Sequence, residues 1–161
     1  MAQFSGKVWV LGDDIDTDII IPTEYLALET VNDMAPYAFS PLRPELAAQI
    51  KEGDIIVAGK NFGCGSSREQ APSVLKALGV KAVIAKSFAR IFYRNSINIG
   101  LPVIVCKDLH ENVNAGDEME LDLQEGIVRV GDKEYQCTKL PAYMQGILDQ
   151  GGLIASLNKE D

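Results

Sequence analysis

The sequence predicts an α/β fold in which a mostly parallel β-α-β-α-β unit occupies the middle of the chain and an antiparallel β-meander follows it. Between residues 54 and 106, short apolar runs alternate with helical patterns, which predicts parallel strands with helices packed on them. After residue 117, alternating runs separated by Gly-containing turns are typical of a meander. The 161 residues predict one domain, 1–161, with an ordinary hydrophobic core.

The first third of the chain predicts two strands and a long connection. Residues 7–11 form a β-rich run, and a second apolar run at 19–21 ends at Pro22. Residues 23–28 are expected to form a helical turn or a loop. Three prolines between residues 31 and 44 predict an irregular connection there.

The remaining elements lie in the middle and the last third. The expected strands of the parallel unit span residues 54–58, 81–86 and 101–106. The helices between them span 68–78 and 88–97, because apolar residues recur there at helical spacing and Gly79 follows the first. The expected meander strands span 118–123, 127–130 and 133–137, and a helical pattern covers 142–149.

Composition and charge exclude several classes of protein. No apolar run approaches the roughly 18 residues that cross a bilayer, and the N-terminus lacks a signal-peptide pattern. We therefore expect a soluble, cytoplasmic protein with no membrane partner. The net charge of −8 disfavours nucleic acid. Residues 60–107 nevertheless carry eight basic residues and one acid, Glu69, so an anionic ligand would be drawn to the middle of the chain.

The cysteine and histidine content predicts no metal on this chain. Cys64, Cys106 and Cys137 are far apart and odd in number, which argues against a secreted disulfide framework. The sequence has no CxxC pair and one histidine, His110, so we expect it to hold neither zinc nor an iron–sulfur cluster. His110 lies in a polar stretch and is expected in a loop or at a helix end.

Chemistry is expected in the Gly-rich loop after the strand at 54–58, because open α/β sheets place ligands at the carboxyl ends of their strands. Gly63 and Gly65 let a ligand approach the backbone closely. Arg68 adds a guanidinium fork for a carboxylate or a phosphate. The loop has neither the Gly-Lys-Ser/Thr of a P-loop nor the Gly-x-Ser-x-Gly of a nucleophile elbow.

The start of the next helix decides the role of two serines. Ser66 and Ser67 both stand at capping-box spacing, so either could begin a helix whose free N–H groups point at an anion. Pro72 is favoured at the first helical position, which would start the helix near Ala71 and leave both serines in the loop. The alternative to an anion-binding loop is an N-cap serine beside a surface arginine, Arg68.

A second polar cluster holds four aspartates: Asp13, Asp14, Asp16 and Asp18. The spacing lacks the glycine and the distal glutamate of an EF-hand, so a solvated acidic turn is a better interpretation than a calcium site. Residues 16–18 lie between two expected strands and could reach the same edge of the sheet as the Gly-rich loop.

Four motifs occur in order over essentially the whole chain, at residues 16–22, 25–28, 62–71 and 86–92, with Asn95 after the last. Together they resemble the small-subunit family of the 3-isopropylmalate dehydratases, the separately encoded swivelling domain of the aconitase superfamily. The Gly-Ser-Ser-Arg-Glu and Ser-Phe-Ala-Arg segments are highly specific as a pair. Gln70 departs from the His of much of the wider family. The resemblance implies a swivelling β/β/α domain.

The resemblance also implies an activity and roles for individual residues. The reaction is a dehydration and rehydration that interconverts 2-isopropylmalate and 3-isopropylmalate through 2-isopropylmaleate, in leucine biosynthesis. Ser66 aligns with the catalytic base that removes the proton α to a carboxylate. Ser67 and Arg68 align with ligands of the substrate carboxylates, and Asp18 aligns with an acidic residue at the edge of the site.

A serine hydroxyl is a poor base unless its alkoxide is stabilised. The backbone N–H groups around Gly63, Cys64 and Gly65, a helix start and the Arg68 guanidinium are the means available for lowering its pKa. Cys64 itself is either an oxidation-sensitive thiol or, as we favour, a small filler.

The resemblance places the other half of the reaction on a partner. It implies an iron–sulfur large subunit that carries a [4Fe-4S] cluster and further substrate ligands, in a heterodimer or heterotetramer. This chain would bind no cofactor of its own, would take a small dicarboxylate as substrate and would be inactive alone.

Substrate choice in the superfamily is attributed to a loop that is Tyr25, Leu26, Ala27 and Leu28 in this sequence. Homoaconitase-like relatives place an arginine at the position of Ala27 to pair with an extra carboxylate. An uncharged loop favours an alkyl substituent over a third carboxylate. Citraconate or citramalate, 2,3-dimethylmalate and homoaconitate remain alternative substrates, and a non-catalytic anion-binding module or a purely structural interaction protein are alternative functions.

Overall fold

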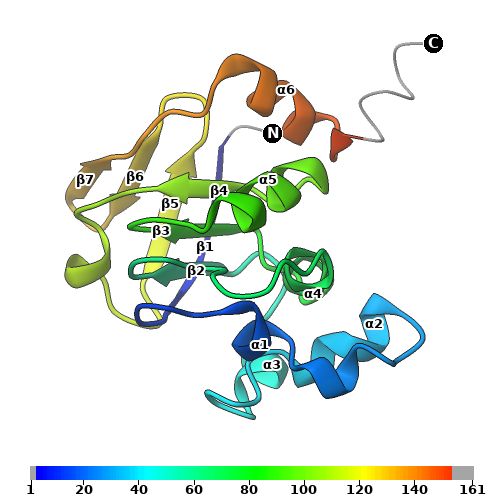
Figure 1. Cartoon of the computed structure of the whole chain (residues 1–161). Coiled ribbons are helices and arrows are strands. Elements are labelled where there is room, and N and C mark those ends of the chain that lie inside the picture. The colour runs from blue at the N-terminus through cyan, green and yellow to red at the C-terminus, as the bar shows by residue number, and fades with distance from the viewer. Residues whose placement is uncertain (1–2, 154–161) are drawn as a thin grey trace.

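The computed structural model describes residues 3–153, and within them seven strands form one sheet in the order β4-β3-β2-β1-β5-β6-β7 (Figure 1). The strands are β1 (Gln3–Val10), β2 (Ile55–Ala58), β3 (Ala82–Ala85), β4 (Val103–Val105), β5 (Glu118–Asp122), β6 (Ile127–Val130) and β7 (Lys133–Gln136). Strands β1 to β4 pair in parallel, whereas β5, β6 and β7 continue the sheet in antiparallel pairs. The predicted parallel unit and meander are both confirmed.

Strand β1 belongs to both halves of the sheet. Its last residues pair in parallel with β2, with Val8 opposite Ile55, and its first residues pair antiparallel with β5. At the changeover, a Cβ on Gly6 would lie 2.1 Å from the carbonyl oxygen of Gly53. A side chain has no room there, so the close approach of the two backbones requires glycine.

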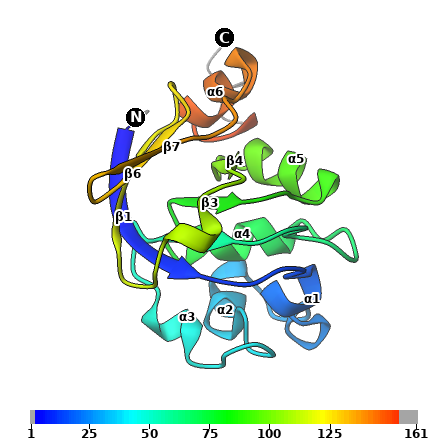
Figure 2. The same ribbon diagram turned by 90° about the vertical axis from the view of Figure 1, so that its left-hand side faces the viewer.

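Helices α4 (Gln70–Ala77) and α5 (Arg90–Asn98) are the crossovers of the parallel unit. Figure 2 shows them stacked beside the parallel strands, with α1 and α2 continuing the stack. The short helices are α1 (Thr17–Ile20), η1 (Thr23–Tyr25), α2 (Val31–Met34), η2 (Ala35–Tyr37), α3 (Leu46–Gln49) and η3 (His110–Asn112). The last helix, α6 (Ala142–Asp149), has its predicted bounds. No helix within residues 3–153 is long and apolar enough to cross a bilayer.

The predicted strand at residues 19–21 is wrong, because this segment lies in and just after helix α1. The Asp16 side chain accepts a hydrogen bond from the Ile19 N–H at 2.9 Å and caps the helix. Thr17, Ile20 and Ile21 are all buried, at the i, i+3, i+4 spacing of one helix face. Cap and burial together override the β propensity of the isoleucines.

Two further parts of the chain refine the sequence predictions. The connection after residue 30 is not wholly irregular, because Thr30 caps α2 with a 3.1 Å bond to the Asp33 N–H. Helix α3 was not predicted. His110 begins η3, as expected of a helix-end residue, and its Nε2 lies 2.7 Å from the carbonyl oxygen of Leu11.

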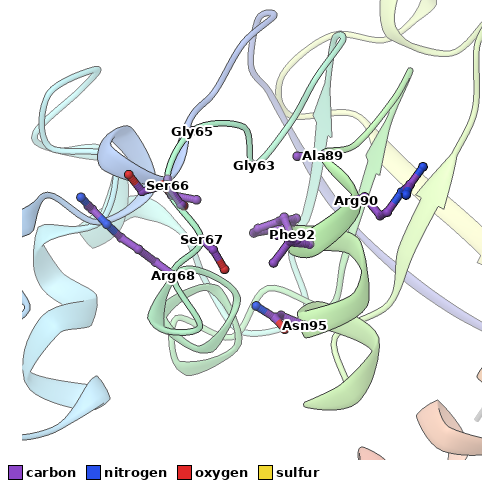
Figure 3. Close-up of a pocket in the computed structure, with 11 residues that line it drawn as sticks. Gly63, Gly65, Ser66, Ser67, Arg68, Ala89, Arg90, Phe92 and Asn95 are labelled. Carbon is purple, nitrogen blue, oxygen red and sulfur yellow. The ribbon is translucent and has the colours of Figure 1, made fainter.

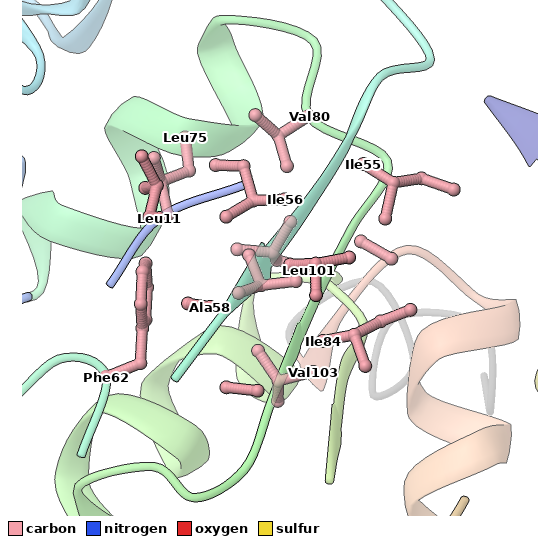
Figure 4. Packing of buried hydrophobic residues seen from close by; sticks show 14 of the residues in the cluster. Leu11, Ile55, Ile56, Ala58, Phe62, Leu75, Val80, Ile84, Leu101 and Val103 are labelled. Atoms are coloured by element: carbon pink, nitrogen blue, oxygen red, sulfur yellow. The ribbon is translucent and has the colours of Figure 1, made fainter. Parts of the chain in front are cut away.

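The core lies on both faces of the parallel strands, and the helices stacked on these strands cover one of the faces (Figure 4). Every residue of β2 and β3 is buried, which is the physical reason for their continuous apolar sequences. Phe39, Phe62 and Leu75 are fully buried beside them. This rigid layer carries the two loops that leave the carboxyl ends of β2 and β3.

Candidate active site

The two loops after β2 and β3 are joined to each other. The Phe62 N–H donates to the carbonyl oxygen of Ser87 at 3.0 Å, and the Ala89 N–H donates to that of Phe62 at 2.9 Å. The Asn61 N–H also donates to the Ser87 hydroxyl, at 2.8 Å. The Gly-rich loop and the start of α5 therefore form one rigid wall at the carboxyl edge of the parallel strands.

Aromatic packing explains why glycine stands at position 63. Phe62 is buried and contacts Phe88 and Phe92 edge to face, with ring centroids 6.0 Å and 5.3 Å away. Gly63 has φ of 83°, and a Cβ on it would lie 2.2 Å from a ring carbon of Phe92. Both the backbone angle and the nearby ring exclude a side chain.

Helix α1 holds the other side of the Gly-rich loop. The Gly63 N–H donates to the carbonyl oxygen of Ile15 at 2.8 Å, and the Thr17 N–H donates to that of Cys64 at 2.9 Å. The Thr17 hydroxyl donates to the carbonyl oxygen of Ser66 at 2.7 Å. The predicted neighbourhood of the two polar clusters is thus confirmed, although a short helix and not a strand brings it about.

Arg68 ties the loop to the segment after α1. Its Nη1 donates to Asp18 Oδ1 at 3.1 Å and to the carbonyl oxygen of Ile21 at 3.0 Å, and its Nη2 donates to the Thr23 hydroxyl at 2.7 Å. The Arg68 side chain is 15% exposed and that of Asp18 is 64% exposed. The guanidinium, followed by the hydroxyl and N–H of Thr23, holds the pKa of the Asp18 carboxyl below its ordinary value.

A pocket of about 390 Å³ opens between the Gly-rich loop and the start of α5 (Figure 3). Its size is within the range of small-molecule sites. Its lining combines loop residues, α5 residues and one residue of α1: Thr17, Gly63, Gly65, Ser66, Ser67, Arg68, Ala89, Arg90, Ile91, Phe92 and Asn95. In Figure 3 the Ser67 side chain points across the pocket toward Phe92 and Asn95, while Arg68 and Arg90 extend to opposite sides.

The structure brings together most of the predicted site residues. Ser66, Ser67 and Arg68 line the pocket with both loop glycines, and the two serines are exposed. No backbone N–H of residues 64–67 donates to a backbone carbonyl of the described chain, so these donors are available to an anion. Asp18 lies outside the lining and contacts the pocket through Arg68.

Other predicted residues lie outside the pocket lining. Cys64 is half-buried in the loop; burial, and then the charges of Asp16 and Asp14, raise the pKa of its thiol. Tyr25 and Leu26 are half-buried, with the Tyr25 ring stacked on Tyr37 at 4.1 Å, whereas the last two residues of the predicted specificity loop, Ala27 and Leu28, are exposed. None of the four lines the pocket of this chain.

The start of α4 decides between the two roles considered for the serines. The helix begins at Gln70, its N-cap is Glu69, and no side chain caps it. Neither Ser66 nor Ser67 is an N-cap, so both remain in the loop, as the position of Pro72 favours.

Several pocket residues belong to the family motifs but were not named as site residues from the sequence, namely Thr17, Ala89, Arg90, Ile91, Phe92 and Asn95. Five of them, from Ala89 to Asn95, belong to the segment at 86–95 that follows a parallel strand, and this position was the signal that could have found them. The loops after neighbouring parallel strands meet at the same sheet edge. Thr17 belongs to residues 16–18, which were expected to be able to reach this edge of the sheet, but its contact with the Gly-rich loop depends on how α1 folds back.

The cysteines of this chain do not fit an iron–sulfur cluster. Cys106 and Cys137 are buried, and Cys106 Sγ donates to the carbonyl oxygen of Gln136 at 3.8 Å, while Cys64 lies in the Gly-rich loop. The interaction between the two buried side chains lowers the pKa of the Cys106 thiol and raises that of Cys137. Such a cluster needs three or four thiolate ligands around one position. Among residues 3–153 no group of three or more His, Cys, Asp or Glu side chains could hold a metal ion.

Known proteins resemble this chain over nearly its whole length. The model of the aconitase C-terminal domain matches residues 29–108. A protein of Lachnospira eligens named 3-isopropylmalate dehydratase small subunit is 67% identical over 157 residues, which are 98% of this chain and 95% of the relative. The chain belongs to the 3-isopropylmalate dehydratase small-subunit family.

Other members of the small-subunit family extend this result. An Archaeoglobus fulgidus protein named 3-isopropylmalate dehydratase small subunit 1 is 50% identical over 151 residues, covering 92% of this chain and 93% of the relative. The crystal structure of a Methanocaldococcus jannaschii protein titled 3-isopropylmalate dehydratase superposes with a TM-score of 0.93 at 42% identity, covering 98% of this chain and 95% of that one. The family resemblance and the predicted fold class are therefore confirmed.

Proposed function

We propose that this chain, as one domain spanning residues 1–161, is the small subunit of a 3-isopropylmalate dehydratase and interconverts 2-isopropylmalate and 3-isopropylmalate together with a large subunit. One observation supports the proposal most strongly. The residues that the family resemblance assigns to chemistry, Ser66, Ser67 and Arg68, lie on a pocket-lining loop in a chain 67% identical to a named small subunit.

The pocket suits an anionic substrate. A carboxylate placed against the loop would meet the hydroxyl of Ser67 and the free N–H groups of residues 64–67. A guanidinium has five N–H donors, and three of those on Arg68 already serve acceptors within this chain. The other two remain for a substrate carboxylate, in a position that Asp18 and Thr23 hold fixed.

Ser66 is the proposed base for the proton α to a carboxylate. The alkoxide form would be stabilised by neighbouring N–H groups and by the positive charge of Arg68. In the isolated chain Ser66 is exposed, and water weakens each of these electrostatic effects. A partner that covers the pocket and excludes water would strengthen them.

The partner is proposed to be the iron–sulfur large subunit that the resemblance implies, with a [4Fe-4S] cluster held there. The small-subunit names of the relatives support a large partner. Among residues 3–153 no group of three or more potential ligands, cysteines included, could hold a metal ion, which supports a cluster site outside the described part of this chain.

We propose that the loop of residues 25–28 makes the enzyme prefer a substrate with an alkyl substituent. Ala27 and Leu28 are exposed and carry no charge, so they are free to contact a substrate that lies between this chain and its partner. A third carboxylate left unpaired against them would cost several kcal/mol. Related alkyl-malates differ by little more than a methylene group. A binding site distinguishes two substrates that differ by one methylene by about 1 to 3 kcal/mol of binding free energy.

The test is an anaerobic assay of this chain mixed with its large subunit, offered 3-isopropylmalate, citraconate, 2,3-dimethylmalate and homoaconitate. Ser66→Ala removes the proposed base. Ser73→Ala is the matched control, because this α4 hydroxyl bonds the carbonyl oxygen of Glu69 at 3.1 Å and lies outside the pocket lining. We expect 3-isopropylmalate to react with wild type and Ser73→Ala, and not with Ser66→Ala.

Other outcomes of the assay discriminate among the alternatives. Strong preference for citraconate, dimethylmalate or homoaconitate would keep the hydro-lyase assignment and overturn the substrate. Turnover by this chain alone would overturn the need for a partner. A complex with an intact cluster and no turnover of any substrate would favour an anion-binding module.

A further inference from the structure

Thr17 is the residue of α1 that contacts the Gly-rich loop most closely. It is 2% exposed, and it makes two hydrogen bonds to the loop: its N–H to the carbonyl oxygen of Cys64 at 2.9 Å and its hydroxyl to that of Ser66 at 2.7 Å. The backbone bond survives any substitution other than proline, whereas the second bond depends on a hydroxyl at position 17. The conformation of the loop at Ser66 therefore depends on the side chain of Thr17.

The hydroxyl bond fixes the peptide unit between the two site serines. A peptide is planar and, since no cis bond occurs among residues 3–153, its C=O and N–H point in opposite directions. The Ser66 carbonyl points at Thr17, so the Ser67 N–H points away from α1. Fixing this plane therefore sets the backbone conformation of Ser66. It also sets the direction of the Ser67 N–H, which can donate to a ligand in the pocket.

The surroundings of Thr17 make it a rigid support. Asp16 caps α1 and so fixes the helix end on which Thr17 lies. Gly65, with φ of 88°, lets the loop close on this helix: a Cβ there would lie 3.4 Å from the Cβ of Asp16 and 3.7 Å from the Thr17 hydroxyl oxygen. On the other side the loop is held by the packing of Gly63 against Phe92.

We propose that Thr17 is a positioning residue, whose hydroxyl holds the Ser66–Ser67 peptide so that the Ser66 hydroxyl is aimed at the substrate. The proposal rests on the proposed function of Ser66. Thr17 acts through the backbone of the loop and not by touching a reacting atom. Its loss should therefore lower kcat through misplacement of the base and leave substrate binding largely intact.

The test compares Thr17→Val, which keeps the shape and removes the hydroxyl, with Thr17→Ser, which restores the hydroxyl. Thr138→Val is the matched control, since Thr138 is exposed and lies outside the pocket lining. In the reconstituted complex we expect Thr17→Val to lower kcat by about 10- to 100-fold with little change in KM, because small misplacements of a reacting group have effects of that size. Thr17→Ser should recover most of the loss, and Thr138→Val should match wild type.

A second readout uses the isolated chain and no activity. Amide exchange of Gly63 and of residue 17, whose N–H groups bond across the interface between loop and α1, should accelerate roughly 2- to 12-fold in Thr17→Val, the factor that corresponds to one hydrogen bond. Thr17→Ser should exchange like wild type. Equal exchange in Thr17→Val and wild type would overturn the proposal.

The outcomes separate this inference from the proposed function. An inactive wild-type complex would count against the function of Ser66 and against a positioning role that depends on it, whatever the exchange shows. An active wild type with unchanged kcat in Thr17→Val would overturn the positioning role and leave the function intact. A kcat loss that Thr17→Ser fails to recover, or one matched by a rise in KM, would assign Thr17 to general stability or substrate binding instead.

Discussion

The contact of Gly63 with the Phe92 ring makes a quantitative prediction about Gly63→Ala. A Cβ at this position would lie 2.2, 2.5 and 2.7 Å from three atoms of Phe92, and real Cβ contacts are not that short. The residue also has φ of 83°, a conformation that L side chains rarely adopt. The substitution therefore combines overpacking with backbone strain.

The two contributions can be estimated separately. Overpacking of a well-packed site costs about 1 to 3 kcal/mol, and a left-handed backbone angle in a residue with a Cβ costs about 1 to 2 kcal/mol. We expect Gly63→Ala to lower the free energy of unfolding by about 2 to 5 kcal/mol, a large share of the total stability of an ordinary domain.

Urea unfolding of three variants separates these contributions. Gly116 has φ of 94° and open space around its missing Cβ, so Gly116→Ala reports the backbone strain alone. Gly12 has open space and no positive φ, so Gly12→Ala should change the stability by less than about 0.5 kcal/mol. The difference in the free energy of unfolding between Gly63→Ala and Gly116→Ala measures the cost of the steric overlap with Phe92.

Relaxation of the loop would make this difference in unfolding free energy smaller, but it would also change the activity. If the loop moves to accommodate the methyl group, the Ser66 backbone moves with it and kcat of the reconstituted enzyme falls. Gly63→Ala with the stability of Gly116→Ala and with unchanged activity would contradict this prediction, because the methyl group would then fit without disturbing either the core or the site.

Two further predictions follow from the charges and thiols of the site. Asp18 has a lowered pKa in the folded chain, so its ionised form stabilises the fold above the unfolded pKa of about 3.9, and this stabilisation is lost as the pH falls through the folded value. The stability difference between wild type and Asp18→Asn, measured by urea unfolding from pH 7 to pH 2, should therefore be constant near neutral pH and shrink toward zero in acid; a difference independent of pH would contradict this. In thiol titration of the native chain with an aromatic disulfide reagent, Cys64 should react first but more slowly than a free cysteine because its pKa is raised, and Cys106 and Cys137 should react only after unfolding. Equal reaction rates for the three thiols in the native chain would contradict the burial of Cys106 and Cys137.

The sequence determined the parallel unit and the meander, because their signals are local. Strands β2 and β3 are buried on both faces, so their sequences are continuously apolar, and the turns and helix ends between them carry glycine. Figure 4 shows the result: Ile56 lies beside Leu75 of α4 and Ala58 points toward Phe62 at the start of the Gly-rich loop, while Ile55 and Ile84 extend to the opposite side of the strands. Alternation of strand and helix in the chain already implies this layer.

The sequence also singled out Ser66, Ser67 and Arg68, since two glycines, two serines and an arginine after a buried strand form an unusual run. It predicted that residues 16–18 could reach the same edge of the sheet, but not the contact of Thr17 with Ser66, because the residues are far apart in the chain and the segment of Thr17 carries a β-like pattern of isoleucines. A side-chain cap from Asp16 and the burial of Ile20 and Ile21 turn that segment into a helix.

The contacts that hold the site, and the direction in which the Arg68 guanidinium points, depend on the tertiary structure and could not be inferred from the sequence. Arg68 is fixed by Asp18, Ile21 and Thr23, and the Ser66 carbonyl by Thr17. These contacts join α1 and the segment after it to the loop following β2, and their geometry depends on how the chain folds back over the sheet. Residue types and local patterns predict which groups can bind an anion, whereas the packing of distant segments determines where each donor points.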